Sequence, residues 1–202
     1  MRLLDWFRRA RASRLLREAF WVIDKSRDKA TMESAIPLLK DASVLDPGNP
    51  HIWNETAFVL GRLGREEEAV EAARQAVRIA PNEPKFHNAE AGIRFHSIIR
   101  AKPARKVAEP KLKEAVREIE GLIQRWPAYP AFHLGHAEAL AASGAPETAW
   151  EAALDRAANI YDGQVVMADG LKTSGERLRE VLRSSRTQCL NYARWWTSLA
   201  DE

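Results

Sequence analysis

The chain has 202 residues, of which 46% are hydrophobic and 29% charged, and its formal net charge is +3. A chain of this length is most simply one domain with a sizeable core, and its single cysteine, Cys189, excludes an internal disulfide. No apolar run approaches the roughly 20 residues that span a bilayer, and the N-terminus lacks a secretory signal pattern. We therefore expect a cytoplasmic protein.

The N-terminal segment, residues 1–30, is basic and helical in pattern. It carries nine basic and four acidic side chains, and residues 2–27 have the apolar spacing of a helix. The apolar face of its first turns is interrupted at Arg14. We therefore expect a kink or two helices near residues 11–14.

The next helix is predicted at residues 34–45. With Ser34 as the N-cap, Pro37 would lie in the first turn, where backbone N–H groups have no helical partner in any case. Two further helices are predicted at 50–63 and 66–80, and a long helix begins near residue 84.

Residues 49–84 carry the strongest pattern in the chain. Trp53 is a large residue near the start of the first helix, and Ala57 is a small residue at a position where two helix axes can approach closely. Gly64 ends the first helix and Pro81 ends the second.

This pattern resembles the tetratricopeptide repeat (TPR), a helix–turn–helix unit of about 34 residues. Weaker copies occur at residues 34–46 and 130–161. The resemblance implies an all-α, right-handed α-solenoid of about three TPR-like units over residues 31–161. The basic N-terminal segment would cap one end, and helices within residues 162–202 would cap the other.

One unit is longer than the family pattern. The alanine that opens its second helix occurs about 12 residues late, at Ala115, and the added length lies in residues 98–112. We expect a helix to about Lys102, a basic loop that ends at Pro110, and then a helix at 111–126.

In TPR domains the first helix of each unit lines a concave groove, so the resemblance implies a binding site for an extended or helical segment of another protein. Asn54 and Asn88 are one repeat apart, and each amide can pair with a ligand backbone. Arg62, Lys85 and His96 would favour an acidic segment, and two phenylalanines would give apolar contact. The full predicted groove consists of His51, Asn54, Phe58, Arg62, Lys85, Asn88, Phe95 and His96.

Two alternative functions remain open. Residues 2–17 and 94–113 are rich in arginine and lysine, and such a basic patch can bind nucleic acid or an anionic surface. Its principal members are Arg8, Arg9, Arg11, Arg14, Arg100, Lys102, Arg105 and Lys106. The chain could also be a structural subunit of a larger assembly, docked by its first helix or by Trp195 and Trp196.

An enzymatic role is not expected. The sequence has no glycine-rich phosphate loop, no nucleophile elbow and no paired cysteine motif, so we expect no catalytic residues and no cofactor. His133 and His136 are spaced i, i+3, which can support a metal. Their repeat positions face the interior and no further ligand completes a site, so we expect a structural role and no metal.

Overall fold

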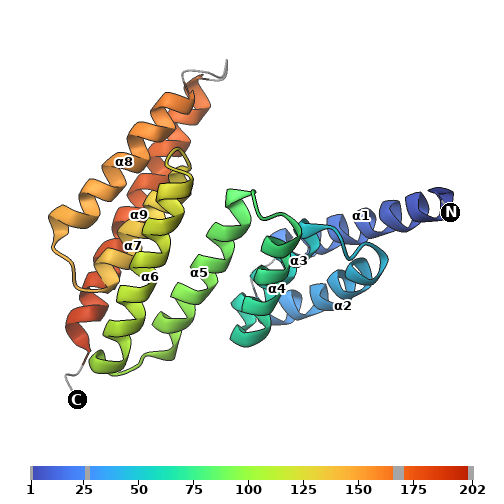
Figure 1. The fold of residues 1–202 in the computed structure, drawn as a ribbon, viewed down its shortest axis with the longest axis horizontal. Helices are drawn as coiled ribbons and strands as arrows, with labels where there is room; N and C mark the ends of the chain where they lie inside the picture. Colours follow the sequence, from blue (N-terminus) through green and yellow to red (C-terminus); the bar gives the residue numbers. More distant parts are fainter. Residues whose placement is uncertain (1, 26–27, 166–170, 200–202) are drawn as a thin grey trace. The chain divides into compact units, whose positions relative to one another are not determined.

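A computed structural model describes residues 2–25, 28–165 and 171–199. All regular structure in these ranges is helical, which confirms the all-α prediction (Figure 1). The chain forms two compact units, unit 1 (residues 1–97) and unit 2 (residues 98–202). The helices are α1 (Arg2–Lys25), α2 (Lys29–Leu45), α3 (Pro50–Leu63), α4 (Glu66–Ile79), α5 (Pro84–Ala101), α6 (Arg105–Arg125), α7 (Pro130–Ala142), α8 (Glu147–Val165) and α9 (Leu171–Ser198).

In unit 1, α1 is one continuous helix that packs against α2, so the predicted break at residues 11–14 is wrong. The centre of the contact is made by small residues. Ala12 and Ala19, seven positions apart, are both fully buried, on either side of Arg14. Alanines allow the two helices to approach closely, and larger apolar residues of α1, among them Leu16 and Ile23, pack partly buried around them.

Helix α2 begins five residues earlier than predicted. Asp28 is its N-cap, and one carboxylate oxygen accepts a hydrogen bond from the Thr31 backbone N–H at 2.8 Å. Pro37 therefore lies inside the helix and not in its first turn. Its side chain is on the exposed face, where water can satisfy the carbonyl left without a partner.

Helices α3 and α4 have the predicted bounds to within one residue. Gly64 ends α3 in the left-handed conformation, with φ of 79°. The two helices cross at a cluster of buried small residues that includes Ala57, Ala69 and Ala73. This confirms the close crossing that the alanine spacing predicted.

A common turn precedes α3, α5 and α7 and fixes the repeat register. The first turn of each helix places one ring N–H on the carbonyl oxygen of the proline six residues earlier. The pairs are Trp53 with Pro47, His87 with Pro81 and His133 with Pro127, each at 2.9 Å. Since a carbonyl only accepts, Nε2 of each histidine carries the proton. His133 thus has a structural role, and the register holds on both sides of the added residues 98–112.

The added segment 98–112 is largely helical, and the basic loop predicted between Lys102 and Pro110 is short. Helix α5 continues to Ala101, close to the predicted end, but α6 begins at Arg105, ahead of Pro110. Buried side chains at helical spacing, among them Ala108, Leu112 and Ala115, continue through this proline, which lies on the exposed face. The apolar stripe therefore outweighs the one missing hydrogen bond.

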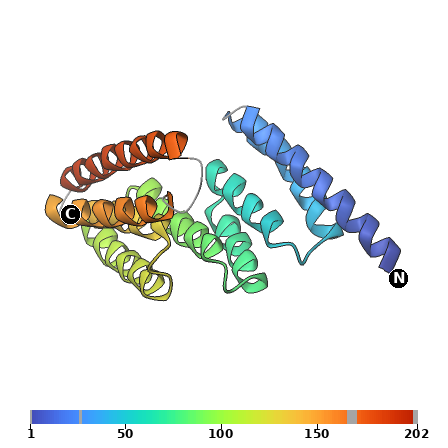
Figure 2. The same ribbon diagram turned by 90° about the horizontal axis from the view of Figure 1, so that it is seen from above.

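In unit 2, α7 is surrounded by α6, α8 and α9 and is buried on most sides. Helix α8 continues to Val165, and the long helix α9 that follows lies alongside α8 in both ribbon views (Figures 1 and 2). Near its end, Trp196 packs onto Gly144, and the Arg105 guanidinium lies 5.1 Å from the centre of the indole. Trp195 and Trp196 are both half-buried.

Candidate binding groove

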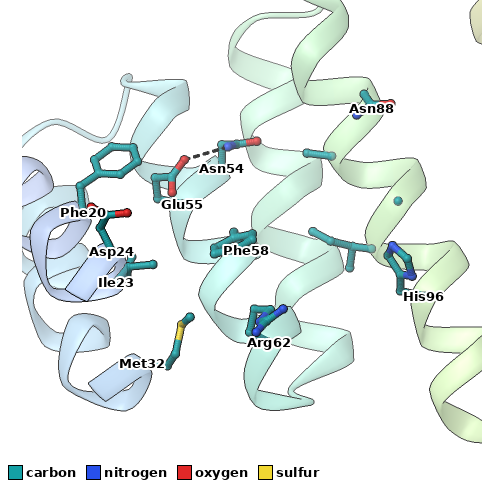
Figure 3. Close-up of a pocket in the computed structure, with 13 residues that line it drawn as sticks. Phe20, Ile23, Asp24, Met32, Asn54, Glu55, Phe58, Arg62, Asn88 and His96 are labelled. Carbon is teal, nitrogen blue, oxygen red and sulfur yellow. Dashed lines mark hydrogen bonds between the residues drawn. The ribbon is translucent and has the colours of Figure 1, made fainter. Parts of the chain in front are cut away.

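A groove of about 750 Å³ lies on unit 1, bordered by α1, α2, α3 and α5 (Figure 3). Three side chains of α3, Asn54, Phe58 and Arg62, follow one another at intervals of one helical turn and face it. Its volume is in the range of ligand pockets, so it can accept several side chains of another molecule.

Helix α5 presents the same three positions one repeat later, as Asn88, Gly92 and His96. Asn88 matches Asn54, His96 matches Arg62, and Gly92 stands where α3 has Phe58. An added Cβ at Gly92 would meet nothing within 4 Å. The structure thus brings five of the eight predicted groove residues together, with an open space at their centre beside Phe58.

His51 and Lys85 lie one turn earlier on α3 and α5 and do not line the groove. Lys85 Nζ is 3.4 Å from Nε2 of His51, and the His51 ring packs edge-on against Phe86. Burial, and then the Lys85 charge, lower the pKa of His51. The imidazole is therefore a neutral acceptor for the ammonium, and the pair links the first turns of the two helices.

Phe95 does not face the groove. Its side chain is 3% exposed, on the same face of α5 as buried Ala91, so the prediction that it contacts a ligand is wrong. Apolar surface comes from residues that the repeat pattern did not indicate. These are Phe20 and Ile23 of α1, Met32 of α2, and Ile93 of α5.

The groove carries both signs of charge. Glu55 and Asp24 line it together with Arg62 and His96, and neither carboxylate was predicted (Figure 3). Asn54 Nδ2 donates to Glu55 Oε1 at 3.1 Å. Burial raises the pKa of Glu55, and this hydrogen bond opposes the rise. The groove therefore offers Glu55 beside Asn54 at one end of α3 and Arg62 near the other.

The predicted basic patch is divided between the two units. Arg8, Arg9, Arg11 and Arg14 are exposed on α1, and Arg100, Lys102 and Lys106 are exposed beyond residue 97. Arg105 differs from these, because it is half-buried and its Nη2 donates to the Trp196 carbonyl at 3.2 Å. Its guanidinium joins the start of α6 to α9.

In unit 2, Glu138 of α7 occupies the repeat position that Phe58 has in α3 and Gly92 has in α5. This carboxyl is half-buried beside α9, where it acts electrostatically on Cys189 and Tyr192. Burial raises the pKa of Glu138 from 4.5 to about 7. The position that is open at Gly92 is thus covered in unit 2 by the C-terminal helix.

The stability of the chain should fall as the pH rises from about 4.5 through 7, because folding favours protonated Glu138 and ionisation of the buried group opposes it. Glu138→Gln should remove this loss and raise the free energy of unfolding at pH 8 by up to about 3 kcal/mol. Urea unfolding at about pH 5 and pH 8 measures the effect, with exposed Glu114→Gln as the control. Equal pH profiles for the two variants would contradict it.

Within the described residues no group of histidine, cysteine and acidic side chains is arranged to hold a metal ion. None of the described helices is long and apolar enough to span a membrane.

No protein-family model matches the sequence, and no curated protein matches it. Solved structures do match its fold. The thermophilic TPR protein TTC0263 of Thermus thermophilus has a TM-score of 0.62 and 16% identity, over 93% of this chain and 97% of that one. The chain has the tetratricopeptide-repeat fold. MamA matches with a TM-score of 0.50 and 14% identity, over 93% of this chain and 98% of MamA.

A third TPR-fold match is a mutant O-GlcNAc transferase of Thermobaculum terrenum. It has a TM-score of 0.54 and 15% identity, and the match covers 75% of this chain and 27% of the transferase chain. At these identities the likeness concerns the fold.

Proposed function

We propose that this TPR-fold chain is a non-enzymatic adaptor, and that its groove in unit 1 binds an extended or helical segment of a partner protein. The observation that carries the proposal is the match between α3 and α5. Asn54 and Asn88 stand one repeat apart and line the same groove, together with apolar side chains and an open space beside Phe58. Stacked repeats in general present such surfaces to extended ligands.

The groove suggests the chemistry of the partner segment. Asn54 uses an amide N–H on Glu55 and keeps its carbonyl oxygen as an acceptor for a backbone N–H of the ligand. An apolar side chain of the ligand would occupy the space beside Phe58. Asp24 and Glu55 would favour a basic residue, and Arg62 and His96 an acidic one. We therefore propose a segment with an apolar centre and both charges, in place of the acidic segment that the sequence suggested.

Gly92→Trp tests this directly. The position is open, so the indole should fill the groove without displacing the fold, and affinity for the partner segment should fall at least about 100-fold. Gly121→Trp is the matched control, because Gly121 is an exposed helical glycine of unit 2 with similarly open space. A partner captured from source cells supplies the peptide, and titration calorimetry gives its affinity for both variants.

The outcome separates the groove from other surfaces. If Gly92→Trp binds the partner as Gly121→Trp does, the groove is not the site. Asn54→Ala combined with Asn88→Ala should lower the affinity for the same peptide by about 10-fold or more, since two hydrogen bonds to the peptide backbone are lost. Circular dichroism confirms that each variant remains folded.

A further inference from the structure

The first turns of α1 project beyond the helix that packs against it. Helix α1 has 24 residues and α2 has 17, and buried Ala12 already meets Ala42 in the last turn of α2. Every side chain from Leu4 to Arg11 is exposed. We name residues 4–11 the α1 arm, and Figure 2 shows this end of α1 extending past α2.

Large apolar side chains of the arm face solvent. Leu4 is 69% exposed, Trp6 62% and Phe7 56%, and the Trp6 and Phe7 rings pack edge to face with centroids 5.0 Å apart. At helical spacing Leu4, Trp6 and Phe7 spread over about half of the helix circumference with Arg11 among them, and Asp5, Arg8 and Arg9 lie on the other half. Clusters of exposed apolar residues generally mark interaction sites.

The charge of the arm is also unbalanced. Arg8, Arg9 and Arg11 stand against the single carboxylate Asp5, and Arg14 follows one turn later. None of these four arginines forms an ion pair with another described residue. The arm therefore presents uncompensated positive charge beside tryptophan, phenylalanine and leucine.

We infer that the α1 arm binds the surface of an anionic lipid bilayer. Leu4, Trp6 and Phe7 would enter the boundary between headgroups and acyl chains, where aromatic rings are favoured. The arginines would extend their charged ends to the lipid phosphates while their aliphatic parts cover apolar surface. The groove would remain accessible, since α1 contributes to it from Phe20 to Asp24, at the opposite end of the helix.

Two other occupants fit the arm less well. A nucleic acid would attract the arginines but would leave Leu4 and the apolar side of the helix in water. A two-fold contact with a second copy of the chain would bring together two arms of like net charge. An anionic bilayer satisfies both the apolar side and the charge.

The test uses the full chain with two kinds of vesicle, pure phosphatidylcholine and phosphatidylcholine containing about 30% phosphatidylglycerol. Co-sedimentation should show binding to the anionic vesicles at least about 10-fold tighter than to the neutral ones, and added salt should weaken it. Arg8→Gln with Arg11→Gln should weaken it about 25-fold, since each arginine near an anionic surface contributes about fivefold. Trp6→Ser with Phe7→Ser should also abolish most of the binding.

Lys111→Gln with Arg117→Gln is the matched control, because it removes two exposed charges from α6 and should leave binding unchanged. Equal affinity for both vesicles, or arm variants that bind like the control, would overturn the inference. It would also be overturned if the arm substitutions abolished binding to RNA or DNA while vesicles were not bound. A dimer of the wild-type chain that Trp6→Ser with Phe7→Ser converts to a monomer would instead identify a contact between copies.

Discussion

Gly144→Ala should lower the free energy of unfolding by about 2–5 kcal/mol, one of the two largest effects we expect from a single substitution in this chain. Gly144 follows α7 with φ of +81°, a conformation that costs a residue with a side chain about 1–2 kcal/mol. An added Cβ would also overlap the indole of Trp196, 2.7 Å from Cδ1. The indole cannot yield easily, because Arg105 covers its ring and binds the Trp196 carbonyl.

Gly64→Ala is the matched control for this prediction. Gly64 has nearly the same φ, +79°, but its Cβ position is open. It should therefore show only the backbone cost, about 1–2 kcal/mol. Urea denaturation followed by circular dichroism compares the two variants. If Gly144→Ala is no more destabilising than Gly64→Ala, the packing of Trp196 against this turn is not as tight as the structure indicates.

Phe86→Ala should destabilise the chain by about 3–5 kcal/mol, because the ring is 1% exposed and its removal leaves a cavity. The ring lies in the first turn of α5, directly before the groove residues Asn88, Gly92 and His96. Loss of the Phe86 ring should also loosen the side of the groove formed by α5, and so lower the affinity for the partner segment. Thermal and urea unfolding measure the first effect, and peptide titration measures the second.

A substitution on the opposite wall separates stability from binding. Phe20 is 44% exposed and lines the groove. Phe20→Ala should therefore lower the free energy of unfolding by less than about 1 kcal/mol, while it reduces the affinity for the partner peptide. Phe86→Leu should recover most of the stability that Phe86→Ala loses. Wild-type peptide affinity for Phe20→Ala would show that α1 takes no part in the site.

The sequence predicted the helices of the central repeat well because local signals and packing agree there. Gly64 ends α3, Ala57 and Ala69 form the crossing, and proline opens both α3 and α5. Prolines were misleading where packing opposed them. The sequence predicts helix starts near Pro37 and Pro110, but each proline lies on an exposed face of a helix whose other side is buried.

The groove was only partly predictable for a different reason. Asn54, Arg62 and their partners on α5 follow from the 34-residue register, which fixes positions within repeated helices. Asp24 and Phe20 lie on α1, and no repeat signal placed that helix. Phe95 was misplaced by a single position next to His96, an error of one helical step that moves a side chain from the groove to the interior.

The shared turn before α3, α5 and α7 shows what these repeats have in common. The position filled by Trp53, His87 and His133 requires a ring N–H directed at a proline carbonyl, and two different residue types satisfy it. A repeat of this kind can have either tryptophan or histidine at this position and keep its geometry, because both residues donate a ring N–H to the proline carbonyl. Aligning such repeats by the hydrogen bond that each position makes would detect similarities that a comparison of residue identities misses.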